Sequence, residues 1–107
     1  KLIRVSQGEI QDVIVDIRPA SNTYGQWESF TLSSSNNRSL FIPRGFAHGF
    51  LVLSKDAVVN YKVDNYYDSN LDAGIVYNDT TLNIQWELPH QDIIVSDKDK
   101  KLPSFQK

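Results

Sequence analysis

Alternation of apolar and polar residues dominates the chain and predicts short β-strands. In the segment QDVIVDIR, residues 11–18, Val13, Val15 and Ile17 alternate with the residues at positions 12, 14 and 16. A period of two places successive side chains on opposite faces of a strand. Similar segments, rich in β-branched and aromatic residues that favour strands, lie at residues 1–5, 25–33, 39–43, 48–54 and 57–66.

Clusters of Gly, Pro, Asn, Asp and Ser separate these segments and predict turns. They lie at residues 6–9, 18–25, 33–37, 43–47 and 54–56. No window carries a convincing helical apolar period; only SDKDKKLP predicts one helical turn, with Ser96 as its N-cap and Pro103 beyond its end. Short strands joined by frequent turns predict an all-β fold, an antiparallel sandwich or barrel, in a single domain.

Composition narrows the classes of partner and compartment. The net charge is -2 and no block of basic residues occurs, which argues against a nucleic-acid partner. No apolar stretch approaches the roughly 18 to 20 residues that span a membrane, and no signal peptide is visible. Cysteine is absent, so we expect neither disulfides nor thiolate metal sites, and a cytoplasmic location. Methionine is absent too, and the strand-like pattern begins at Lys1, so we expect an N-terminal portion to be missing.

One of only two histidines, His48, lies in the segment IPRGFAHGF, residues 42–50. A metal site would need further ligands close by, but positions 46 and 50 are phenylalanines and His90 lies in a distant polar stretch. We therefore predict no metal. Two interpretations of His48 stay open: a core histidine bonded to a backbone carbonyl, or a participant in proton transfer or ligand binding.

Proton transfer would need companion groups, and the chain offers several. Tyr61 could act as an acid in a dry site, and Lys1 alternates with Ile3 and Val5, so its ammonium could face the interior toward an oxyanion. Asp99 could orient a base. Each also has a structural interpretation: Tyr61 as a packing residue, Lys1 as an exposed terminal residue and Asp99 as a surface charge. Flat rings for stacking are offered by Trp27, Tyr66 and Tyr67.

The segments GQW, IPRGFAHGF, YK and YY, at these spacings, resemble the dTDP-4-dehydrorhamnose 3,5-epimerases. The likeness extends from KLIRV at the start of the chain to SDKDKKLPSF near its end. It implies a cupin-like jelly roll in which residues 1–107 form one epimerase domain without its N-terminal portion. It also implies a homodimer, no cofactor, and inversion of C3 and C5 of dTDP-4-keto-6-deoxyglucose through an enolate, in dTDP-rhamnose biosynthesis.

The resemblance also assigns roles to individual residues. Lys1 matches a lysine near the keto oxygen of the substrate, Tyr61 the proton donor, and Asp99 the aspartate that orients the catalytic histidine. Four further positions match substrate-binding residues: His48, Lys98, Tyr67, which stacks on the thymine, and Asp72, where the family usually has glutamate. A second departure is Arg44, where a glutamate is common.

The catalytic histidine of the family belongs to an Arg-Gly-Leu-His-like motif upstream of KLIRV, which this chain does not contain. We therefore expect the 107 residues alone to be inactive, and unpaired strand edges to favour association. Two alternatives stay open. One is an enzyme that inverts a single carbon of a 4-keto sugar nucleotide, or a ketoisomerase. The other is a non-catalytic β-sandwich that binds sugar nucleotides on Trp27, Tyr66 and Tyr67.

Overall fold

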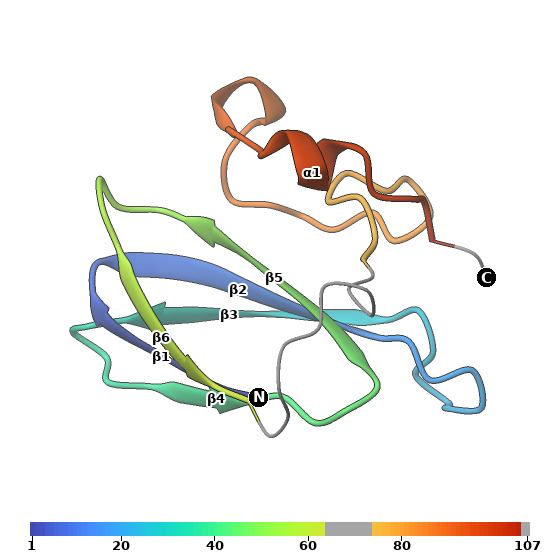
Figure 1. Ribbon diagram of the computed structural model, residues 1–107, viewed down its shortest axis with the longest axis horizontal. Helices are drawn as coiled ribbons and strands as arrows, with labels where there is room; N and C mark the ends of the chain where they lie inside the picture. The colour runs from blue at the N-terminus through green and yellow to red at the C-terminus, as the bar shows by residue number, and fades with distance from the viewer. Residues whose placement is uncertain (64–73, 106–107) are drawn as a thin grey trace.

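A computed structural model describes residues 1–63 and 74–105 (Figure 1). Strands make up nearly all of its regular structure, which confirms the all-β prediction. In chain order the elements are β1 (Leu2–Gln7), β2 (Glu9–Asp16), β3 (Trp27–Ser33), β4 (Ser39–Phe41), β5 (Phe46–Val52), β6 (Val58–Lys62), the 3₁₀ turn η2 (His90–Asp92) and the short helix α1 (Asp97–Lys100). In this part of the chain no helix is long and apolar enough to cross a membrane.

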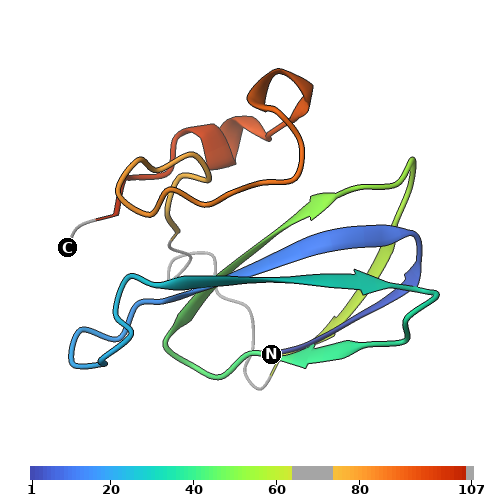
Figure 2. The same cartoon turned by 180° about the vertical axis from the view of Figure 1, so that it is seen from behind.

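The six strands form two antiparallel sheets of three, in the orders β4-β1-β6 and β3-β2-β5. The chain passes from one sheet to the other at each connection between strands except that from β2 to β3, and the sheets face each other (Figures 1 and 2). Alternate residues of β1, Ile3 and Val5, are buried between them and pack with Ile10 and Leu32 of the other sheet. The alternation predicted for residues 1–5 therefore fixes which face of β1 points inward.

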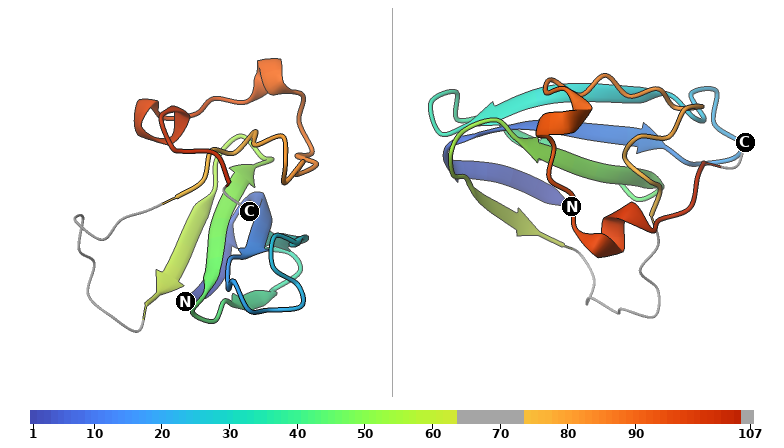
Figure 3. Two further views of the ribbon diagram at one scale, coloured as in Figure 1. Left: turned by 90° about the vertical axis from the view of Figure 1, so that its right-hand side faces the viewer. Right: turned by 90° about the horizontal axis from the view of Figure 1, so that it is seen from above.

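A third layer, the C-terminal segment of residues 74–105, covers the outer face of the β3-β2-β5 sheet (Figure 3). Val13 and Val15 of β2 are buried against Leu82 and Phe105 of this segment. Both faces of β2 are thus covered, and this explains why apolar residues occupy positions 13, 14 and 15 in succession. The segment contains only η2 and α1 as regular elements.

Each segment predicted as a strand overlaps an observed strand, but most of the ends differ: the segment expected at residues 48–54 is β5 at Phe46–Val52. The helical turn was placed more closely. Ser96 caps α1 as predicted, and its hydroxyl accepts a hydrogen bond from the Asp99 N–H at 3.1 Å. The turn expected around residues 43–47 is shorter than predicted. The turn ends at Gly45, which has a positive φ of 89°, and β5 starts at the next residue. Phe46 and Ala47 are strand residues because they pair with Asp16 and Val15 of β2.

Candidate functional site

A cavity of about 800 Å³ lies between β5 and the C-terminal segment. β5 is an edge strand of its sheet, so residues from both of its faces reach the cavity. Four of the residues singled out in the sequence line it together: Lys1, His48, Lys98 and Asp99. The volume is within the range of small-molecule sites, roughly 300–1,000 Å³. The fold therefore brings three distant parts of the chain to one concave site.

Lys1 lies at the start of β1, on the face that carries Ile3 and Val5. Its main-chain nitrogen donates to the Ile42 carbonyl at 2.8 Å, and its carbonyl accepts from the Ile42 N–H at 2.7 Å. These two bonds extend the pairing of β1 with β4 by one residue. Lys1 also lines a second cavity of about 180 Å³ together with His48. Lys1 is exposed, as the terminal-residue interpretation expected, and it also lines both cavities.

His48 lies on β5, directly opposite Ile14 of β2. Its side chain is 10% exposed, and its Nε2 lies 2.5 Å from Oδ1 of Asp12. The approach does not have the alignment of a hydrogen bond, so the two atoms form a close polar contact, which is an ion pair only when the imidazole is protonated. The core-histidine interpretation expected a backbone carbonyl as the partner; the polar neighbour is instead a buried carboxylate.

The other histidine, His90, is not part of this cavity. Its ring packs near that of Tyr77, with the centroids 6.0 Å apart. Within residues 1–63 and 74–105 no group of three His, Cys, Asp or Glu side chains is placed to hold a metal ion. Of the two histidines in the chain, only His48 lines the cavity.

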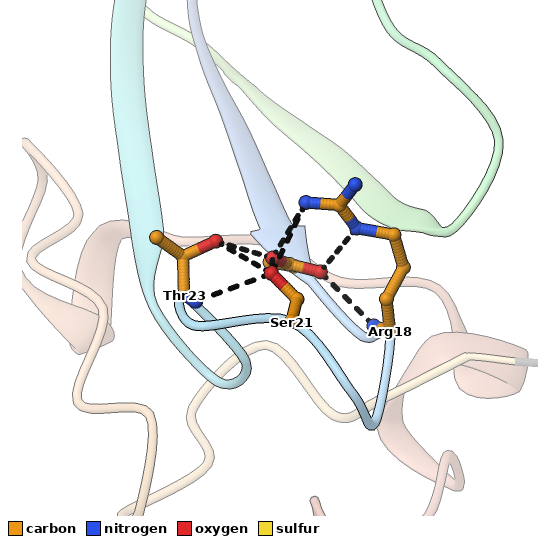
Figure 4. Close-up of polar contacts among 4 residues, drawn as sticks. Arg18, Ser21 and Thr23 are labelled. Atoms are coloured by element: carbon orange, nitrogen blue, oxygen red, sulfur yellow. Dashed lines mark hydrogen bonds and ion pairs between the residues drawn. The ribbon is translucent and has the colours of Figure 1, made fainter.

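A polar network organises the turn between β2 and β3, which lies beside the start of β5 (Figure 4). The buried Asp16 carboxylate accepts two hydrogen bonds from the Arg18 side chain, at 3.0 and 2.9 Å, and others from the hydroxyls of Ser21 and Thr23. The Arg18 guanidinium, aided by the two hydroxyls, holds the pKa of Asp16 well below its usual range. Arg18 also lies over the Phe46 ring, 4.8 Å from its centroid.

The opposite wall of the cavity comes from α1, which carries Lys98 and Asp99. Both side chains are exposed to solvent yet belong to the lining of the cavity. Ser96 fixes this turn through its cap on the Asp99 N–H. The exposure of Asp99 agrees with the surface-charge interpretation, and its place in the lining of the cavity also leaves the orienting role open.

The remaining predicted site residues are not brought into the cavity by the described part of the chain. Tyr61 on β6 lies opposite Ile3, so it shares the inner face of its sheet with Lys1. It is 66% exposed and lines neither cavity. Trp27 packs against the Val13 cluster beneath the C-terminal segment and also lines neither cavity. Tyr66, Tyr67 and Asp72 lie outside the described residues.

The sequence pattern did not point to Asp12, a buried residue that lines neither cavity but contacts His48. Its side chain is 0% exposed and faces His48. A signal was present in the sequence, since Asp12 and Asp16 share a strand face with Ile14, and charged residues are rarely buried without a partner. The alternation indicated which face they share, but not which residue would lie beside them.

Comparison with known proteins identifies the family. The family model described as dTDP-4-dehydrorhamnose 3,5-epimerase matches residues 1–107. The chain belongs to the dTDP-4-dehydrorhamnose 3,5-epimerase family. A curated epimerase of this name from Methanothermobacter thermautotrophicus is 50% identical over 101 residues, which are 94% of this chain and 55% of that protein. The chain thus spans about half the length of the curated relatives it matches.

Solved epimerase structures confirm the cupin-like jelly-roll fold. The Bacillus anthracis enzyme, crystallised with TDP and PPi bound, has a TM-score of 0.93 and 48% identity, and covers 97% of this chain and 58% of that one. The Legionella pneumophila enzyme, in complex with dTDP-4-keto-L-rhamnose, has a TM-score of 0.89 and 42% identity, and covers 99% and 62%. Six strands in two facing sheets are therefore part of the epimerase fold.

Proposed function

We propose that the protein containing this chain inverts C3 and C5 of dTDP-4-keto-6-deoxyglucose, as an isomerase of dTDP-rhamnose biosynthesis. The observation that carries the proposal is the shared cavity, in which Lys1 and Asp99, from opposite ends of the chain, lie with His48 and Lys98. A chain selected only to bind a nucleotide on aromatic rings would not need a lysine, a histidine and an aspartate around one space.

The chemistry explains these residue types. A keto group at C4 acidifies the hydrogens on C3 and C5, and a base removes one as a proton. The electron pair left on carbon moves to the C4 oxygen, giving an enolate. The ammonium of Lys1 is the cation that stabilises this oxygen. Tyr61 then returns a proton to the opposite face of the ring, which inverts the carbon.

Asp99 has the role of fixing the imidazole of the base in one tautomer and stabilising its protonated form. That base is a histidine in family members, and we propose that it lies upstream of Lys1. His48, Tyr67, Asp72 and Lys98 are the proposed substrate-binding residues. The proposed reaction uses no metal and no cofactor, because proton transfer and an ammonium are sufficient for it. We further propose that the complete protein acts in the cytoplasm as a homodimer.

The test is incubation of the complete protein with dTDP-4-keto-6-deoxyglucose in deuterated water. Deuterium at both C3 and C5 of the product supports the proposal, and deuterium at one carbon alone supports the single-carbon alternative. Tight binding of the sugar nucleotide without any exchange would instead support a binding module and overturn the proposed enzyme. The 107-residue polypeptide serves as a second sample, in which we expect no exchange; exchange at the rate of the complete protein would contradict the upstream base.

A further inference from the structure

The helix α1 lies in the C-terminal layer (Figure 1) and brings Lys98 and Asp99 to the cavity, but it spans only four residues. In the described part of the chain, the main-chain hydrogen bonds of residues 89–102 are all local and join residues three or four apart. A helix this short has little stability of its own in water. The place of α1 at the cavity is therefore set by the two stretches of chain on either side of it.

Both of these flanking stretches are fastened to the rest of the fold. On the upstream side, the buried side chain of Gln11 on β2 bonds to the main chain of residues 85–87. On the downstream side, the Val76 N–H donates to the Pro103 carbonyl at 2.9 Å. Pro103 lies only three residues beyond the end of α1, so a shift of the downstream stretch is passed on to the helix.

Asp79 completes the downstream attachment. Its buried carboxylate accepts from the Leu82 N–H at 2.8 Å through Oδ1 and from the Phe105 N–H at 2.7 Å through Oδ2. Bonds to an ionised group are stronger than bonds between neutral groups, and these N–H groups hold the pKa of Asp79 below its usual range. One carboxylate therefore ties the turn at residues 79–82 to a residue 26 positions further along the chain.

Packing alone does not define the path of this stretch as closely as the bonds to Asp79. The Phe105 ring lies beside that of Tyr24, with the centroids 5.3 Å apart, but apolar contact has no preferred direction. A hydrogen bond has a narrow range of length and angle. Asp79 lines neither cavity, so any effect it has on a ligand passes through the segment that it holds.

We propose that Asp79 is a positioning residue for Lys98 and Asp99. Its two bonds close the loop of residues 79–105 and hold α1 at the wall of the cavity, with Gln11 as the second point of attachment. Loss of these bonds lets α1 move away from β5, so that Lys98 and Asp99 lose their places in the site. This inference rests on the proposed function, because that function assigns the imidazole of the base to Asp99 and the substrate to Lys98.

Two substitutions of Asp79 grade the loss of its bonds. The amide of Asp79→Asn has one acceptor oxygen in place of two, so it keeps only one bond, and Asp79→Ala keeps neither. Ile10→Val is the control for stability, since Ile10 is buried between the sheets and lines neither cavity. Asp97→Asn is the control for charge, because it removes an exposed carboxylate of α1 that lies outside the lining of the cavity.

The first measurement is amide hydrogen exchange in the complete protein, followed by NMR. The reporter is the Val76 N–H, which bonds to Pro103 and not to Asp79. We expect its exchange to be faster roughly 10-fold in Asp79→Asn, the effect of one hydrogen bond on local opening, and faster still in Asp79→Ala, with the N–H groups of β2 unchanged. Unchanged exchange at Val76 would overturn the proposal. An equal increase in β2, the pattern expected for Ile10→Val, would reveal a merely global loss of stability and would overturn it too.

The second measurement is a double-mutant cycle in the steady-state kinetics of the complete protein. We expect Asp79→Asn to lower kcat roughly 10- to 100-fold by displacing Asp99, and to add little to the loss in Asp99→Asn, where the displaced group is already absent. Asp97→Asn and Ile10→Val should keep the wild-type kcat. The same factor for Asp79→Asn in both backgrounds would overturn the proposal. A wild type without activity would count against the proposed function, while the exchange at Val76 would still decide whether Asp79 holds the segment.

Discussion

The side chain of Gln11 on β2 bonds to the main chain at Glu87, in the segment that covers its sheet. Its Oε1 accepts from the Glu87 N–H at 2.8 Å, while its Nε2 donates to the Gln85 carbonyl and to the Ser29 hydroxyl, each at 3.0 Å. Gln11 is almost fully buried. One amide therefore fastens the C-terminal segment to the sheet, and this segment carries Lys98 and Asp99 to the cavity.

We expect Gln11→Ala to lower the free energy of unfolding by roughly 1–3 kcal/mol, because it leaves the Glu87 N–H and the Gln85 carbonyl without their partner. Gln26→Ala is the matched control, since Gln26 is exposed and its side chain makes none of these bonds. Urea denaturation followed by tryptophan fluorescence gives both values. Equal stability of the two variants would contradict the role of Gln11 as a fastener.

The Asp16 network predicts a dependence of stability on pH. Because its pKa is lowered in the folded protein, the ionised carboxylate stabilises the fold fully above the unfolded-state value of about 3.9. This contribution is lost as the pH falls through the lower folded-state value. We expect Asp16→Asn to be less stable than the wild type at pH 7, with a gap that narrows below pH 4 or so.

The measurement is the free energy of unfolding across this pH range. Asp56→Asn, the same change at an exposed position, is the control and should follow the wild type throughout. A gap between Asp16→Asn and the wild type that stays constant in acid would show that the Arg18 ion pair is not its origin.

Two glycines close to His48, Gly45 and Gly49, should differ in how much stability the protein loses when each is replaced by alanine. Gly45 has φ of 89°, and a Cβ there would lie 2.5 Å from Cγ of Arg18. We expect Gly45→Ala to cost roughly 1–3 kcal/mol of stability and to weaken ligand binding by displacing the start of β5. At Gly49 a Cβ would meet only the Trp86 ring, at 3.9 Å. Thermal unfolding of the two alanine variants tests this, and an equally destabilised Gly49→Ala would contradict it.

Much of the fold could be predicted from local pattern, because strand alternation and helix caps depend on neighbours in sequence. The inward face of β1 and the Ser96 cap are examples. The bond from Gln11 to Glu87 and the contact of Asp12 with His48 could not be predicted. Both depend on which distant segment lies beside β2, and alternation gives the face of a residue but not its neighbour across the sheet.

Lys1 and Lys62 lie on opposite faces of the same sheet, and we expect substitution of Lys1 alone to lower activity. We expect Lys1→Met to lower kcat by roughly 100- to 1,000-fold, the value of one group that stabilises a developing oxyanion. Lys62→Met is the matched control: Lys62 lies on β6 opposite Leu2, and thus on the outer face. Steady-state kinetics of the complete protein gives both values. A comparable loss in Lys62→Met would show that positive charge alone, and not its location, matters.

Tyr61 allows the two halves of the reaction to be separated. It lies opposite Ile3, on the face of the sheet that also carries Lys1, but it is 66% exposed and lines neither cavity. If it is the acid, Tyr61→Phe removes only the returned proton, so we expect kcat to fall by roughly 100- to 10,000-fold with KM little changed. Removal of the first proton would continue, because the base and Lys1 are untouched.

Deuterium exchange resolves these two steps in Tyr61→Phe. Exchange of the substrate hydrogens with solvent, without formation of the inverted sugar, is the expected pattern, since the base can return a deuteron to the face from which it took the proton. Full inversion at the wild-type rate would remove Tyr61 from the mechanism. Loss of exchange together with inversion would mean that the phenol supports proton removal, and would contradict its assignment as the acid alone.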